Sequence, residues 1–93
     1  MTARTLPSLP VGKIVATPNA LAQLTDDDVT AALLRHVFGD WGDVCPADKA
    51  QNDRALLEGT RILSVYYAAN GTKFWIITEA DRSVTTVLLP EDY

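Results

Sequence analysis

The fold is decided by residues 61–89, which read RILSVYYAANGTKFWIITEADRSVTTVLL. Two runs rich in β-branched and aromatic residues flank Asn70-Gly71, a pair that strongly indicates a β-hairpin with a two-residue type I′ loop. A second turn, at Asp81-Arg82, leads into a third run that ends at Leu89. The stretch therefore predicts a three-stranded antiparallel β-meander.

A type I′ loop at Asn70-Gly71 determines which residues oppose each other and therefore which face of the sheet each side chain occupies. It places Tyr66 opposite Trp75, and the second turn pairs Glu79 with Val84. One face is then almost entirely apolar, and we expect helices to cover it. Its members are Leu63, Val65, Tyr67, Phe74, Ile76, Thr78, Thr85, Val87 and Leu89.

The opposite face of the predicted meander mixes polar and apolar residues. Three short helices cover one sheet face more readily than two, so we expect this second face to point away from them. An exposed apolar surface of this kind is typical of a ligand groove or a subunit contact. The residues predicted to form the binding interface are Ile62, Tyr66, Trp75, Ile77 and Leu88.

Caps and apolar spacing predict three helices before the meander, over residues 18–24, 26–38 and 46–58. A short strand is expected at Lys13–Ala16. The fold class is therefore α+β, with about three N-terminal helices packed on one face of a C-terminal three-stranded antiparallel meander. The 93 residues amount to one domain, with residues 1–10 as a flexible leader and 11–93 as a single α+β unit.

Composition and charge narrow the functional classes. The formal net charge of -4 leaves no basic field for phosphates, so nucleic-acid binding is not expected. A single cysteine, Cys45, excludes an internal disulfide. No apolar run approaches the ~20 residues that span a bilayer, and residues 1–10 lack a signal-peptide core, so we expect a cytoplasmic protein. Asp40, Asp43 and Asp48 lack the spacing of a calcium loop, and we predict no metal and no cofactor.

His36 is the single histidine, so acid-base chemistry based on histidine would have to use it. It falls on the apolar side of the second predicted helix, which favours a buried, hydrogen-bonded ring. If the protein is an enzyme, Asp40, Asp43 or Asp53 would orient the ring, and Arg82 at a hairpin tip would bind an anion. Arg61 could instead pair with Asp53 and join helix to sheet.

Several stretches of the chain resemble a group of small uncharacterised bacterial proteins labelled plasmid-related or hypothetical. The residues concerned are His36-Val37, 39–43 (GDWGD), 52–56 (NDRAL), 61–66 (RILSVY) and 73–90 (KFWIITEADRSVTTVLLP). The resemblance implies a bacterial cytoplasmic setting and carriage on mobile elements, and it supplies no activity and no catalytic residues. A looser resemblance, to small ribonuclease toxins of the barnase, colicin and RelE type, lies in helices that precede an antiparallel sheet.

These observations predict a non-enzymatic protein-interaction module that forms a homodimer through the aromatic sheet face. The expected partner is a second copy or another protein. One alternative is a small ribonuclease-like or other hydrolase toxin that uses His36 with nearby acidic residues. The other, implied by the resemblance, is an accessory subunit of a mobile-element defence or antidefence system.

Overall fold

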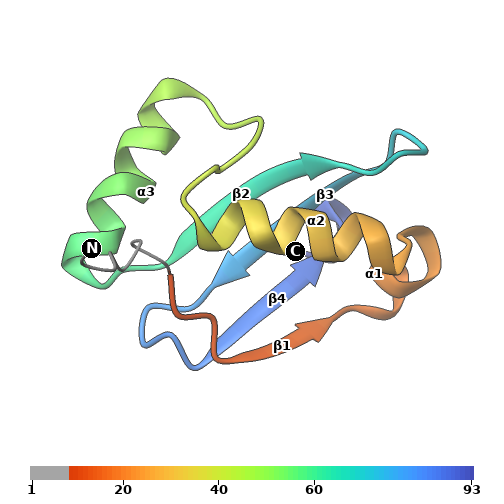
Figure 1. Ribbon diagram of the computed structural model, residues 1–93, viewed down its shortest axis with the longest axis horizontal. Coiled ribbons are helices and arrows are strands. Elements are labelled where there is room, and N and C mark those ends of the chain that lie inside the picture. The colour runs from red at the N-terminus through yellow and green to blue at the C-terminus, as the bar shows by residue number, and fades with distance from the viewer. Residues whose placement is uncertain (1–8) are drawn as a thin grey trace, which may run out of the picture.

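The computed structural model describes residues 9–93 of the protein (Figure 1). Its elements are β1 (Lys13–Ala16), α1 (Pro18–Gln23), α2 (Asp26–Val37), α3 (Pro46–Glu58), β2 (Ile62–Tyr67), β3 (Lys73–Thr78), β4 (Val84–Leu88) and the 3₁₀ helix η1 (Pro90–Asp92). The predicted helices and the short strand at Lys13–Ala16 are present. The predicted capping box is also present, because Thr25 and Asp28 exchange backbone and side-chain hydrogen bonds at the start of α2.

The sheet has four strands in the order β1-β4-β3-β2, and β1 pairs with β4 in parallel. The predicted purely antiparallel three-stranded meander is therefore wrong: the sheet is mixed, and one of its strands precedes the helices. Turn residues reveal only strands that are neighbours in the chain. The three α-helices and two strands lie between β1 and β4 in the chain, so no local sequence pattern predicts that these two strands pair.

The register of the first hairpin differs from the prediction by one residue. Tyr66 lies opposite Phe74, and Val65 lies opposite Trp75. The second hairpin has the predicted register, since the Glu79 N–H donates to the Val84 carbonyl at 3.0 Å. A shift of one residue turns every side chain of β2 to the other face.

The first hairpin loop explains this shift. Gly71 has a φ of +89°, whereas Asn70 is not among the residues with positive φ, and a type I′ turn needs positive φ at both central positions. Instead, the Gly71 N–H donates to the Ala68 carbonyl and the Ala68 N–H donates to the Thr72 carbonyl, both at 2.9 Å. Asn70 uses its side chain locally and accepts from the Thr72 N–H at 2.9 Å. The loop therefore contains three residues, which moves β2 by one position along β3.

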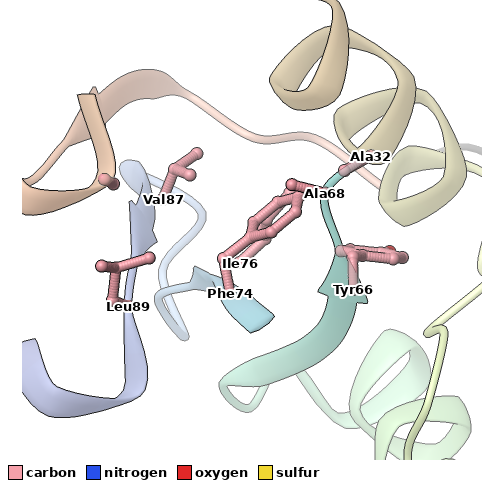
Figure 2. Packing of buried hydrophobic residues seen from close by; sticks show 8 residues of the cluster. Ala32, Tyr66, Ala68, Phe74, Ile76, Val87 and Leu89 are labelled. Carbon is pink, nitrogen blue, oxygen red and sulfur yellow. The ribbon is translucent and has the colours of Figure 1, made fainter. Parts of the chain in front are cut away.

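The helices α1 and α2 cover one face of the sheet (Figure 1). The main core cluster lies between these two helices and the sheet. It consists of Ala20, Ala32, Tyr66, Ala68, Phe74, Ile76, Val87 and Leu89. Figure 2 shows the strand side chains of this cluster projecting toward the helical layer. The predicted covered face is thus correct for β3 and β4 and reversed for β2, so Ile62 and Tyr66 lie beneath the helices, 0% and 1% exposed.

The third helix, α3, lies beside β2 rather than over the centre of the sheet (Figure 1). A second cluster joins Leu9, Trp41, Ala55 and Ile62 there. Leu9 is buried, and its N–H donates to the Val37 carbonyl at 2.9 Å. Leu9 therefore packs in the fold, and residues 1–8 of the predicted leader lie outside the described residues. Across residues 9–93, no helix is both long and apolar enough to cross a membrane.

Candidate functional site

His36 lies at the centre of a buried polar network between α2 and the sheet. Its ring nitrogens bond to one hydroxyl from each of two strands: Nδ1 lies 2.6 Å from Ser64 Oγ, and Nε2 lies 2.8 Å from Thr78 Oγ1. The ring edge also packs against Trp41, with centroids 5.7 Å apart. The buried position predicted from helical spacing is confirmed, since His36 is 0% exposed.

The hydrogen bonds of this network determine the tautomer of the ring. The Thr85 hydroxyl donates to the Val11 carbonyl at 2.8 Å, so Thr85 must accept at its contact with Thr78, 2.7 Å away. Thr78 therefore donates to Thr85 and accepts from the Nε2–H of His36. Nδ1 is then the acceptor of the Ser64 hydroxyl. The network therefore fixes the tautomer of the neutral imidazole as the one protonated at Nε2.

The electrostatic surroundings favour the same neutral state. Burial, followed by the nearby positive charge of Arg82, lowers the pKa of His36 to about 4. Burial penalises the charged imidazolium, and an added proton on Nδ1 would face a hydroxyl that already donates. The ring is therefore uncharged at pH 7.

A serine hydroxyl 2.6 Å from a histidine nitrogen has the geometry of a nucleophile and its base. Here Ser64, His36 and Thr78 are all 0% exposed, so a substrate cannot reach Ser64 Oγ in this conformation. The lowered pKa also makes the ring a weak proton acceptor near neutral pH. The network instead stabilises the fold, because its hydrogen bonds connect α2 to β2, β3 and β4.

Asp40, proposed above to orient the histidine, is bound to a different residue. It forms a bidentate ion pair with Arg35, at 2.7 Å and 3.1 Å, and also accepts from the Gly42 N–H. The hydrogen bond from Arg35 holds the pKa of Asp40 below its usual range. Arg35 also stacks on the ring of Tyr66, with its guanidinium carbon 4.9 Å from the centroid. His36 and Asp40 therefore form no acid-base pair.

Asp53 likewise serves the packing of α3. It accepts from the indole N–H of Trp41 at 2.9 Å and from Lys49 at 3.0 Å, and these bonds lower its pKa. The expected pairing of Asp53 with Arg61 is wrong. The guanidinium of Arg61 lies instead over the ring of Tyr93, 5.5 Å from its centroid.

Arg82 turns back from the second hairpin and binds backbone carbonyls. Its guanidinium donates to the carbonyls of Ala55, Thr60 and Glu79, at 2.9, 2.7 and 3.1 Å. The last turn of α3 contains no basic residue of its own, so Arg82 supplies a positive charge to the negative end of that helix. The guanidinium is thus engaged with the protein rather than presented at the hairpin tip to bind an anion.

The sheet face opposite α1 and α2 carries the rest of the predicted interface. We call it the open face; its partly or fully exposed apolar and aromatic residues are Val15, Leu63, Tyr67, Trp75, Val84 and Tyr93. Ile77 and Leu88 also belong to this face but are only 4% and 5% exposed. Tyr93 packs edge-on against Trp75, with centroids 5.6 Å apart.

Sequence reasoning missed Tyr67 and Tyr93 as members of this face. Reading the first loop as a three-residue loop would have found Tyr67, which is 54% exposed and donates to Asp43 at 3.1 Å. No local pattern places Tyr93, because its position depends on how the residues after β4 turn back. Pro90, which starts η1, is a local signal for the turn itself, but it does not indicate against which side chain Tyr93 then packs.

A shallow cavity of about 350 Å³ lies between α3 and the start of β2, and its walls mix charged, amide and aliphatic groups. Its lining residues are Asp48, Gln51, Asn52, Thr60, Arg61 and Leu63. In the part of the chain that the structure describes, no three histidine, cysteine or acidic side chains gather as metal ligands. Asp40, Asp43 and Asp48 therefore do not converge on a cation.

Comparison with protein-family models found no matching model, and comparisons with curated proteins and with solved structures found no match. The resemblances drawn from the sequence thus remain predictions. Any functional conclusion has to come from the geometry of the chain itself.

Proposed function

We propose that the protein is a non-enzymatic interaction module whose open face packs against a second copy of the chain. The observation that supports this proposal is the layer arrangement: within residues 9–93, α1 and α2 cover one side of the sheet and no α-helix covers the other, where Tyr93, after η1, packs against Trp75 (Figure 1). The uncovered side nevertheless presents aromatic and aliphatic side chains. Aromatic residues are enriched at protein interfaces, where they supply large contact areas.

The two tryptophans differ in how their indole N–H groups are paired. Trp41 is buried and its indole N–H donates to Asp53, whereas the indole N–H of Trp75 is buried with no acceptor among the described residues. A buried donor without a partner costs about 1–3 kcal/mol. The protomer's own atoms cover this donor, so a second copy could supply an acceptor only if those atoms moved aside.

The residues named for the alternative hydrolase function do not favour it. His36 has no exposed surface, Asp40 and Asp53 are bound to basic side chains, and Arg82 binds backbone carbonyls. None of these four groups pairs with another. The interaction module therefore accounts for more of the observed geometry.

Substitution of Trp75 tests the proposal. Trp75→Arg places a charge at the centre of the open face, and we expect it to halve the mass of the particle while the chain stays folded. The measurement is light scattering at tens of micromolar, with circular dichroism to verify the fold. Leu57→Arg is the matched control, because Leu57 is 90% exposed on α3, away from the open face, and should leave the particle mass unchanged.

A wild-type chain that is monomeric under these conditions would contradict the proposal. An unchanged particle mass in Trp75→Arg would contradict it equally.

A further inference from the structure

The two edge strands of the sheet, β2 and β1, differ in whether their outward backbone groups have hydrogen-bond partners. The outer edge of β2 is occupied along most of its length, since the Asn52 side chain donates to the Leu63 carbonyl at 2.8 Å and accepts from the Leu63 N–H at 3.3 Å. Two residues further along β2, the Val65 N–H donates to the Trp41 carbonyl at 3.0 Å, and the Val65 carbonyl accepts from the Asp43 N–H at 2.8 Å. These contacts satisfy the groups through which a foreign strand would pair.

The outer edge of β1 has no such cover. The N–H of Lys13 donates to the carbonyl of Ser83, just before β4, and the N–H of Thr17 donates to the carbonyl of Val87 in β4, both at 3.0 Å. Because backbone groups alternate in direction along a strand, the N–H and C=O of Ile14 and Ala16 point outward. Nothing in residues 9–93 pairs with them, since β1 ends the strand order.

Ile14 carries an exposed apolar side chain on this edge. The side chain is 49% exposed, and Ala16, on the same side of the strand, is only partly buried. A strand paired along this edge would cover both side chains.

We propose that two copies of the chain pair through their β1 edges, antiparallel, into one continuous sheet. The outward groups suit one register: Ile14 opposite Ala16 of the second copy, with the two Val15 residues facing each other. All outward N–H and C=O groups of Ile14 and Ala16 then pair, forming about four hydrogen bonds across the two-fold axis. Lys13 lies opposite Thr17, so no like charges meet.

The edge pairing is independent of the contact proposed for the open face. Its two-fold axis is perpendicular to the sheet, so both open faces remain free on the same side of the joined sheet. If both contacts form, two joined sheets stack through their open faces and the particle is a tetramer. Each contact can then be removed separately.

Substitutions at Ile14 test the edge. Its N–H points outward, so Ile14→Pro removes a donor for the second copy while leaving the bonds to β4 intact. Ile14→Lys keeps the N–H and places a charge at the edge, and Ile14→Val is the matched control. We expect light scattering to show the particle mass halved by Ile14→Pro and by Ile14→Lys, in the wild type and in Trp75→Arg, and unchanged by Ile14→Val.

Hydrogen exchange of the Ile14 and Ala16 amides provides a second measurement. These amides should be protected in the wild type and lose protection in Ile14→Lys. The edge proposal is overturned if Ile14→Lys keeps the wild-type mass, if Trp75→Arg alone is already monomeric, or if a monomeric wild type still protects these amides. A dimer that Ile14→Lys separates and Trp75→Arg does not would support the edge and overturn the open-face contact.

Discussion

At the scale of single residues, side chains that suggest chemistry in the sequence prove to be bound within the fold. His36 joins hydroxyls of two strands, and Arg82 binds the carbonyl of Ala55 in the last turn of α3, of Thr60 just after it and of Glu79 in its own hairpin. All of these contacts except the one between Arg82 and Glu79 connect segments far apart in the chain. A polar side chain with satisfied internal partners stabilises the fold and has little capacity left for a ligand.

The lowered pKa of His36 predicts a specific dependence of stability on pH. The ring titrates at about 4 in the folded protein and near 6.5 when unfolded, so the unfolded state takes up its proton first as the pH falls. Stability is therefore complete above about pH 7 and decreases through the window between these two pKa values. We expect a loss of about 2 kcal/mol in the free energy of unfolding between pH 7 and pH 5.

Urea unfolding at the two pH values measures this loss, and His36→Gln serves as the control because it removes the titrating ring. Carboxylates contribute mainly below pH 5, outside the interval. If NMR shows the His36 ring titrating near its ordinary pKa in the folded protein, the buried neutral network is wrong.

At the scale of elements, local chemistry determines the helices, and contacts with other elements complete the strands. Pro46 and Gly59 bound α3, and Gly59 takes the left-handed conformation that ends a helix. The edge of β2, in contrast, depends on Asn52 from the middle of α3. Its side-chain amide substitutes for a neighbouring strand at Leu63.

Replacing Asn52 should therefore weaken the fold at one defined place. Asn52→Ala leaves the N–H and C=O of Leu63 without partners, and we expect the free energy of unfolding to fall by about 1–3 kcal/mol. The Leu63 amide should also exchange faster with solvent. Gln51→Ala, an exposed neighbour on the same helix, should change stability by less than about 0.5 kcal/mol. Equal effects of the two substitutions, measured by urea unfolding, would refute the edge-capping role.

At the scale of the whole molecule, the two ends of the described chain are tied together by Asp92. Its carboxylate accepts from the Thr17 hydroxyl at 2.6 Å, from the Asn19 amide at 2.7 Å and from the Leu89 N–H at 3.0 Å. These bonds, the one from Thr17 first, lower the pKa of Asp92. They connect η1 to the start of α1 and hold the segment that carries Tyr93 near Trp75.

Removing this connection should lower stability and loosen the open face. We expect Asp92→Ala to lower the urea midpoint and to disturb the NMR signals of Trp75, because Tyr93 loses its anchor. Glu91→Ala removes an adjacent exposed carboxylate that makes none of these bonds and should leave both observables unchanged. If Asp92→Ala keeps the wild-type urea midpoint and the wild-type Trp75 signals, the hydrogen bonds of Asp92 do not stabilise the fold.

The helices and the second hairpin could be predicted from the sequence because their determinants are local. Thr25 with Asp28 starts α2, Gly59 ends α3, and the pairing of Glu79 with Val84 follows from the turn between them. The buried position of His36 also follows from helical spacing. In each case the residues that decide the structure lie within a few positions of one another.

The tertiary structure alone decided the parallel pairing of β1 with β4 and the partners of His36, Asp53 and Arg82. It also decided the loop type at Asn70-Gly71, where the Asn70 amide donates to Gln23 at the end of α1 and Asp28 of α2 binds the Ala69 N–H. Those contacts accompany a three-residue loop. The register that this loop sets places Tyr66 on the face covered by the helices. The energy differences between such loops are small, so contacts with distant elements select among them, and a local pattern contains no record of those elements.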